Sequence, residues 1–135
     1  MSAVRSELDA TGETSAYNAR ASVAITTHIL DIARGRPAAG VPVTLEKGSS
    51  PEGWQLVGSG ETDADGRLRT LMPEGMALTP GMYRLVFDTR RYLEGQSGRA
   101  FFPTISIVFE TAAGESHYHV PLLLSPFGYS TYRGS

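Results

Sequence analysis

The chain contains no cysteine among its 135 residues. Disulfides and thiolate metal sites are therefore excluded, and a hydrophobic core must supply the stability. An excess of one charge is also lacking, because 12 Lys and Arg residues stand against 14 Asp and Glu residues. The resulting net charge of −2 gives no electrostatic reason to expect nucleic acid or an anionic membrane as a partner.

Long apolar runs are missing as well, since no stretch approaches the ~20 residues that a bilayer-spanning helix needs. Residues 1–20 mix Ser, Ala, Thr, Gly and both charges without the apolar centre of a secretory signal, and we predict a disordered extension there. Residues 21–135 are long enough to form one domain with its own core. These features lead us to expect a cytoplasmic protein.

What the chain does have is a regular succession of short β-branched and aromatic runs between turn residues, which is typical of an all-β sandwich. We predict strands over residues 22–30, 41–47, 54–62, 67–71, 83–88, 104–111, 117–124 and 129–132. A single short helix is predicted over residues 89–94. The Asp63-Ala-Asp-Gly66 segment predicts a tight turn, because the further ligands of a calcium-binding loop do not follow it.

The three histidines lie on two of these strands, on the face opposite the apolar row. Alternate residues of a strand point to opposite faces. His28 therefore faces away from Ile25 and Ile29, and His117 and His119 face away from the Val and Leu residues that alternate with them. We expect the histidines to line a second, partly polar surface.

Two kinds of chemistry fit these residues. His117 and His119 have the spacing by which two imidazoles on one strand reach the same metal, and with His28 they could hold a zinc ion that activates water. Alternatively, Arg67 beside a histidine would disfavour the imidazolium and keep a neutral base available near pH 7. Histidine and arginine together could then deprotonate a water molecule and stabilise the oxyanion formed at a carbonyl, without a metal.

Five segments of the chain resemble the 5-hydroxyisourate hydrolases, the transthyretin-related enzymes of urate breakdown. They are residues 26–31, 35–45, 62–67, 101–103 and 117–135. The closing Tyr-Arg-Gly-Ser of residues 132–135 is the diagnostic piece, because it looks like the hydrolase signature and not like the tail of the hormone carrier. The resemblance covers essentially everything after residue 22 and leaves the N-terminal extension unexplained.

The resemblance implies a transthyretin-like, or prealbumin-like, eight-stranded β-sandwich with one short helix. It further implies a homotetramer with active sites in a channel where dimers meet. The reaction would be hydrolysis of the N1–C6 bond of 5-hydroxyisourate, which gives 2-oxo-4-hydroxy-4-carboxy-5-ureidoimidazoline. No metal, organic cofactor, nucleic acid or membrane is implied.

The same resemblance assigns the catalytic roles to His28, Arg67 and His119. His119, together with His28, would accept the proton of the attacking water. Arg67 would hold a substrate oxygen and keep a histidine neutral. The substrate is expected to contact His28, Arg67, Tyr132 and Ser135, the last two of which would clasp the flat ring.

Two further residues near the C-terminus are expected to take no direct part in the reaction. Arg133 is expected to support the C-terminal tail without touching the ring, and His117 is expected to have no direct role. Two alternatives stay open beside the metal-free hydrolase, namely a non-catalytic transthyretin-like carrier of a small aromatic ligand and the three-histidine zinc hydrolase. A carrier of a mainly apolar ligand would have little need of a base.

Overall fold

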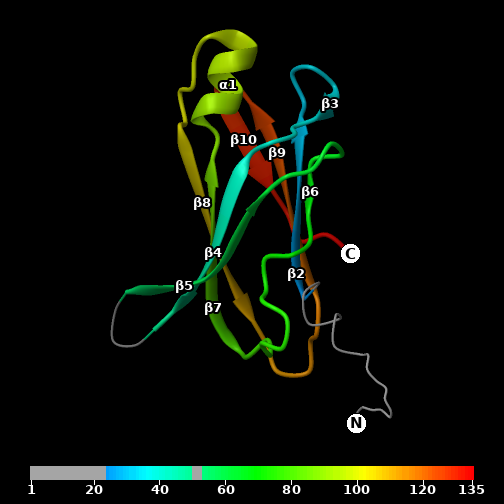
Figure 1. Cartoon of the computed structure of the whole chain (residues 1–135), viewed down its shortest axis with the longest axis vertical. Helices are drawn as coiled ribbons and strands as arrows, with labels where there is room; N and C mark the ends of the chain where they lie inside the picture. The colour runs from blue at the N-terminus through cyan, green and yellow to red at the C-terminus, as the bar shows by residue number, and fades with distance from the viewer. Residues whose placement is uncertain (1–23, 50–52) are drawn as a thin grey trace.

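A computed structural model describes residues 24–49 and 53–135 as two facing β-sheets with one helix at their end (Figure 1). The strands are β2 (Ile25–Asp31), β3 (Arg36–Pro37), β4 (Pro42–Gly48), β5 (Trp54–Glu61), β6 (Arg67–Leu68), β7 (Gly81–Asp88), β8 (Thr104–Thr111), β9 (Tyr118–Ser125) and β10 (Gly128–Thr131), and the helix is α1 (Arg90–Ser97). One sheet has the order β10-β9-β2-β3, with β6 also paired to β2. The other has the order β5-β4-β7-β8.

The core lies between the sheets and is built from the inward residues of alternating strands. In β2 the residues Ile25 and Ile29 are fully buried, and in β9 the residues Leu122 and Leu124 are buried in the same way. The facing sheet contributes a matching row of buried residues: Val43, Leu45, Tyr83, Leu85, Phe87 and Ile105. Burying each such side chain is worth roughly 1.5–3 kcal/mol, so this alternation fixes which face of each strand looks outward.

The side-chain alternation predicted from the sequence is confirmed for both histidine-bearing strands. His28 and His119 are half-buried on the outward face, whereas the residues on either side of them are buried. The strands β2 and β9 run parallel and adjacent, with Thr26 opposite His119. One sheet surface therefore carries both imidazoles.

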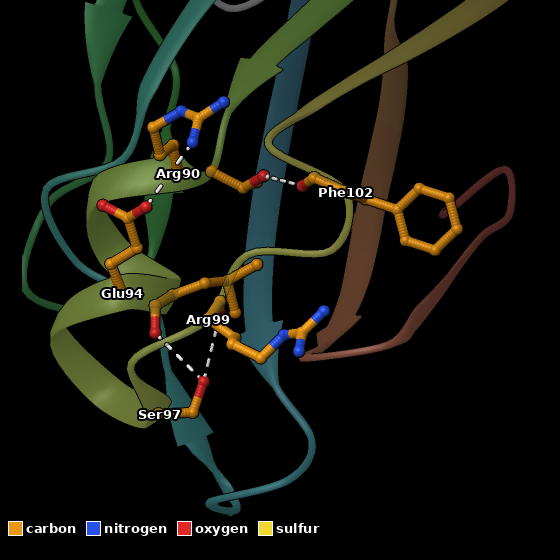
Figure 2. A network of polar contacts seen from close by, with 7 residues as sticks. Arg90, Glu94, Ser97, Arg99 and Phe102 are labelled. Atoms are coloured by element: carbon orange, nitrogen blue, oxygen red, sulfur yellow. Dashed lines mark hydrogen bonds and ion pairs between the residues drawn. The ribbon is translucent and has the colours of Figure 1, made fainter.

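Helix α1 closes one end of the sandwich and is tied to the segment that follows it (Figure 2). Thr89 precedes the helix, but its hydroxyl does not cap it, because it donates a 2.7 Å hydrogen bond to the carbonyl of Phe102. The Ser97 hydroxyl lies 3.1 Å from the carbonyl oxygens of both Leu93 and Arg99. These bonds fasten the loop of residues 98–103 to the two ends of the helix. The loop then leads the chain into β8.

A partly buried hydrogen bond connects α1 to the sheet that contains β2. The hydroxyl of Tyr92 donates to Asp31 Oδ2 over 2.7 Å, and the backbone N–H of Arg34 donates to Oδ1 of the same carboxylate over 3.0 Å. Burial, followed by the Asp31 carboxylate, raises the pKa of Tyr92 to about 12. The tyrosine therefore stays protonated and holds the end of β2 in place.

The predicted all-β sandwich with one short helix is confirmed, with differences at the element ends. Beside the eight predicted strands, the described residues contain the two-residue strand β3, in a segment that the sequence indicates only as a turn. Strand β6 ends at Leu68 and not at residue 71, and α1 extends to Ser97 and not to residue 94. The predicted extension over residues 1–20 and the first residues of the predicted domain and first strand lie outside the described residues.

Candidate active site

The outward surface of three adjacent strands brings together the residues of the candidate site. Strand β2 lies between β9 and the short strand β6. His28 is opposite Arg67 across the β2–β6 pair, and Thr26 is opposite His119 across the β2–β9 pair. Residues that are about 40 and 90 positions apart in the sequence thus become neighbours through strand pairing alone.

A tight turn delivers Arg67 to this surface. Asp63 Oδ1 accepts hydrogen bonds from the backbone N–H groups of Asp65 (2.9 Å) and Arg67 (3.0 Å), and the hydrogen bond from Arg67 is the main reason why the pKa of Asp63 is lowered. Gly66 has φ +77°, and a Cβ there would lie 2.5 Å from the carbonyl oxygen of Ile29. The predicted turn at residues 63–66 is confirmed, and only glycine allows it to approach β2 so closely.

His119 is held on two sides. Its Nδ1 lies 2.7 Å from the hydroxyl oxygen of buried Thr26. On the other side, the backbone N–H of Gly134 donates a 2.7 Å hydrogen bond to the His119 carbonyl, so that the C-terminal segment pairs with β9 as an isolated bridge. In Figure 1 the C-terminus accordingly lies beside the strands of this sheet and not at an end of the sandwich.

A cleft of about 290 Å³ opens over this surface. It is lined by Thr26, Thr27, Arg67, Arg69, His117, His119 and Ser135. Two guanidinium groups, two imidazoles and the chain's last residue therefore face one small space. Such a lining suits a compact polar ligand with carbonyl or anionic oxygens, because guanidinium groups bind these oxygens through paired N–H donors.

The electrostatics of the cleft keep its central imidazole neutral. Burial is the largest cause that lowers the pKa of His119, and the positive charge of Arg67 is the second. His117 and His28 act in the same direction, while a hydrogen bond to the backbone of Thr26 opposes them. At neutral pH the His119 ring therefore has a free nitrogen lone pair that can accept a proton.

The sequence-predicted residues do not all reach the cleft. Arg67, His119 and Ser135 line it. His28 is adjacent to Arg67, but its Nε2 lies 2.8 Å from the carbonyl oxygen of Asp65. When Nε2 carries the proton, the ring donates a hydrogen bond to this carbonyl. His28 thus braces the turn that carries Arg67, and its proton-accepting role stays a prediction.

Tyr132 and Arg133 lie on the other side of the terminal segment. Tyr132 is exposed and lines a separate, more apolar groove of about 230 Å³ beside β8. Arg133 forms an ion pair with Glu115 at 2.9 Å, and its guanidinium lies 4.7 Å from the centre of the Tyr118 ring. These contacts agree with a supporting part for Arg133, because they fasten the tail to the start of β9.

Sequence reasoning missed Arg69 and Thr26. Arg69 is two positions after Arg67 and projects to the same side of the chain, so the spacing alone could have indicated it. Thr26 carries no signal of its own, since a threonine in a strand is ordinary. Only the register between β2 and β9 shows that its hydroxyl meets His119.

The zinc alternative finds no support in the arrangement of the histidines. Across residues 24–49 and 53–135, no group of three or more His, Cys, Asp or Glu side chains is placed to hold a metal ion. His117 and His119 meet at the Thr26 hydroxyl, whereas His28 contacts the Asp65 carbonyl. Within the same residues there is also no helix long and apolar enough to cross a membrane.

Comparison with known proteins gives a consistent picture. The model of the HIUase/Transthyretin family matches residues 25–134. The 5-hydroxyisourate hydrolase of Salmonella typhimurium is 49% identical over 111 residues, which cover 82% of this chain and 80% of that protein. The solved structure of Klebsiella pneumoniae 5-hydroxyisourate hydrolase is 38% identical with a TM-score of 0.68, covering 82% of this chain and 97% of that one. The structure of transthyretin from Sparus aurata is 34% identical with a TM-score of 0.76, covering 83% and 97%. The two-sheet fold, the matched length and these identities together show that the chain belongs to the HIUase/transthyretin family.

Proposed function

We propose that the protein hydrolyses 5-hydroxyisourate to 2-oxo-4-hydroxy-4-carboxy-5-ureidoimidazoline, as an enzyme of urate degradation. The observation that carries this proposal is the half-buried imidazole of His119, kept neutral by burial and by Arg67 in a cleft lined with guanidinium groups. The family includes a carrier as well as hydrolases, so the fold alone does not decide between them. A neutral base beside two cations is what a hydrolase of a cyclic amide needs.

The chemistry follows from this arrangement. His119, assisted by His28, accepts a proton from a water molecule, and the resulting hydroxide adds to the C6 carbonyl of the substrate. Arg67 stabilises the negative charge that develops on the carbonyl oxygen. The C6–N1 bond then breaks, the imidazolium of His119 gives its proton to N1, and C6 becomes a carboxylic acid, which loses its proton to the solvent to give the carboxylate of the product. Arg69 lies in the same cleft and adds a second positive charge near the oxygens.

We further propose that the working enzyme is a cytoplasmic homotetramer. Strands β8 and β10 are each one edge strand of their sheet, and Val108, Tyr129 and Tyr132 on or beside them are large exposed apolar residues. Unpaired edges with exposed apolar side chains favour pairing with another chain. Tyr132 lies outside the cleft of its own chain and would clasp the substrate from the opposite wall of the channel between dimers.

The proposal is tested by a spectrophotometric assay in which urate oxidase generates the short-lived 5-hydroxyisourate. We expect the purified protein to speed the decay of this intermediate in proportion to its concentration, and to keep its activity after treatment with a chelator. A carrier would bind without accelerating the decay. A decay rate equal to that without protein would refute the hydrolase, and loss of activity on chelation would restore the zinc mechanism.

The pH dependence of the reaction should reflect the lowered pKa of His119. Protonation of the ring removes the base, so kcat/KM is expected to fall on acidification with a midpoint below the ordinary histidine pKa of about 6.5. Because the charge of Arg67 disfavours the imidazolium, Arg67→Gln should raise the pKa of His119. NMR titration of the His119 ring in wild type and variant measures this shift even if the variant is inactive. An unchanged or lower pKa in Arg67→Gln would contradict the assigned electrostatics.

A further inference from the structure

The Thr26 side chain contacts both imidazoles of the cleft. Its hydroxyl oxygen lies 2.7 Å from His119 Nδ1 and 3.4 Å from His117 Nε2. The side chain is buried, with 6% of its surface exposed, although it lies on the outward face of β2. The two histidines cover it, so water has little access to compete for these contacts.

The neighbouring threonine shows that the contact depends on the face of the strand. The hydroxyl of Thr27 points to the opposite side and donates a 2.6 Å hydrogen bond to the backbone carbonyl of Val120. The parallel register places Thr26 directly opposite His119. The two adjacent hydroxyls therefore have different partners, because neighbouring residues of a strand point to opposite faces.

A hydroxyl can donate one hydrogen bond and accept others. The Thr26 hydroxyl and the two imidazoles can therefore form a chain of hydrogen bonds in which all donors point the same way. In one direction, His119 Nδ1–H donates to Thr26 and the Thr26 hydroxyl donates to His117 Nε2. In the other direction, His117 Nε2–H donates to Thr26, the hydroxyl donates to His119 Nδ1, and the His119 proton lies on Nε2. Only the first direction leaves His119 Nε2 with a free lone pair toward the cleft.

The position of the hydroxyl favours the first direction for a ring that acts as a base. The Thr26 hydroxyl oxygen already occupies the Nδ1 side of the ring at 2.7 Å, so Nδ1 is not the nitrogen that a water molecule in the cleft can approach. The nitrogen that accepts the proton of water is then Nε2, and in the neutral ring the proton lies on Nδ1.

We propose that Thr26 is a positioning residue that holds His119 as the Nδ1–H tautomer, with the Thr26 hydroxyl proton passed on toward His117. The role of Thr26 in turnover rests on the proposed function, whereas the tautomer of His119 can be measured whether or not the protein is a hydrolase. His117, which is exposed, acts through Thr26 and not on the substrate. When His119 takes up a proton on Nε2, its Nδ1–H stays bonded, so the ring gains charge without losing its orientation.

The tautomer can be measured directly. In the wild-type protein labelled with ¹⁵N-histidine, we expect the neutral His119 ring to be protonated at Nδ1 at a pH above its pKa. A ring protonated mainly at Nε2 would overturn the inference, whether or not the protein hydrolyses 5-hydroxyisourate. This measurement needs no variant and therefore does not depend on the folding of one.

Substitution then tests the role in turnover. Thr26→Val keeps the shape and removes the hydroxyl, so we expect kcat to fall about 10- to 100-fold with KM nearly unchanged, and the Nδ1–H preference to weaken. Thr26→Ser should restore most of both. The matched control is Thr44→Val in β4 of the other sheet, which removes a threonine hydroxyl away from the cleft and should leave the His119 tautomer as in wild type.

The outcomes separate this inference from the function on which it rests. A wild-type protein without hydrolase activity but with the Nδ1–H ring refutes the proposed function alone. An active enzyme in which Thr26→Val keeps wild-type kcat and the wild-type tautomer refutes the part assigned to Thr26. A variant with raised KM and unchanged kcat also refutes it, because the hydroxyl would then serve binding.

Discussion

Replacing His119 by asparagine is expected to lower kcat by about 10²–10⁴-fold, the usual contribution of a positioned general base. The side chain is half-buried on the outward sheet face, so its loss opens no hole between the sheets. Asparagine retains a polar group near Thr26 but has no nitrogen that can accept a proton at neutral pH. The loss should therefore appear in the rate of 5-hydroxyisourate decay and not in the folded state.

Circular dichroism and thermal unfolding measured on the same preparation check that the fold is kept. Tyr129→Phe serves as the matched control, because it changes an exposed aromatic residue on the neighbouring strand β10 and preserves its ring. We expect this control to retain near wild-type turnover. If His119→Asn also turned over at close to the wild-type rate, His119 could not be the base.

The fold was predictable because its main determinant is local. Alternation of apolar and polar residues places His28 and His119 opposite the buried rows of β2 and β9, and the structure confirms both assignments. The turn before Arg67 was equally readable, since Asp at its first position and Gly at its last carry the required hydrogen bonds and backbone angle. These features need no knowledge of which strands become neighbours.

The details of the site depend on that knowledge and escaped prediction. Strand alternation puts Thr26 on the histidine face, but only the parallel register with β9 brings its hydroxyl to His119. Strand β6 is two residues long and ends at Leu68, so Arg69 lines the cleft from a position just beyond the strand. Tyr132 follows the last residue of β10, where the chain turns toward β9, so strand alternation could not foretell on which side it would lie.

The second large effect is expected at Gly134, which has no chemically active side chain. A Cβ on this residue would lie 2.6 Å from Cδ2 and 3.3 Å from Cγ of the His119 ring. Non-bonded carbon atoms at their optimal separation are about 3.5–4.0 Å apart, so Gly134→Ala forces either the ring or the tail to move. The backbone hydrogen bond from Gly134 to the His119 carbonyl resists movement of the tail.

Movement of either the ring or the tail changes the positions of the residues that line the cleft. A displaced ring no longer holds its contact with Thr26, and a displaced tail removes Ser135 from the lining. Misplacement of a reacting group by about 1 Å costs on the order of 10²-fold in rate, and we expect Gly134→Ala to lower kcat/KM by at least that much. The terminal segment adds little to the core, so the melting temperature should change by only a few degrees.

The control for this prediction is another glycine of the same terminal segment. At Gly128 in β10 a Cβ would meet nothing closer than the Ser125 hydroxyl oxygen at 3.8 Å, which is ordinary van der Waals contact. Gly128→Ala should therefore keep near wild-type activity in the 5-hydroxyisourate assay. Equal losses in both variants would mean that the tail is merely intolerant of alanine, whereas a loss confined to Gly134→Ala ties the close approach of the C-terminus to the working position of His119.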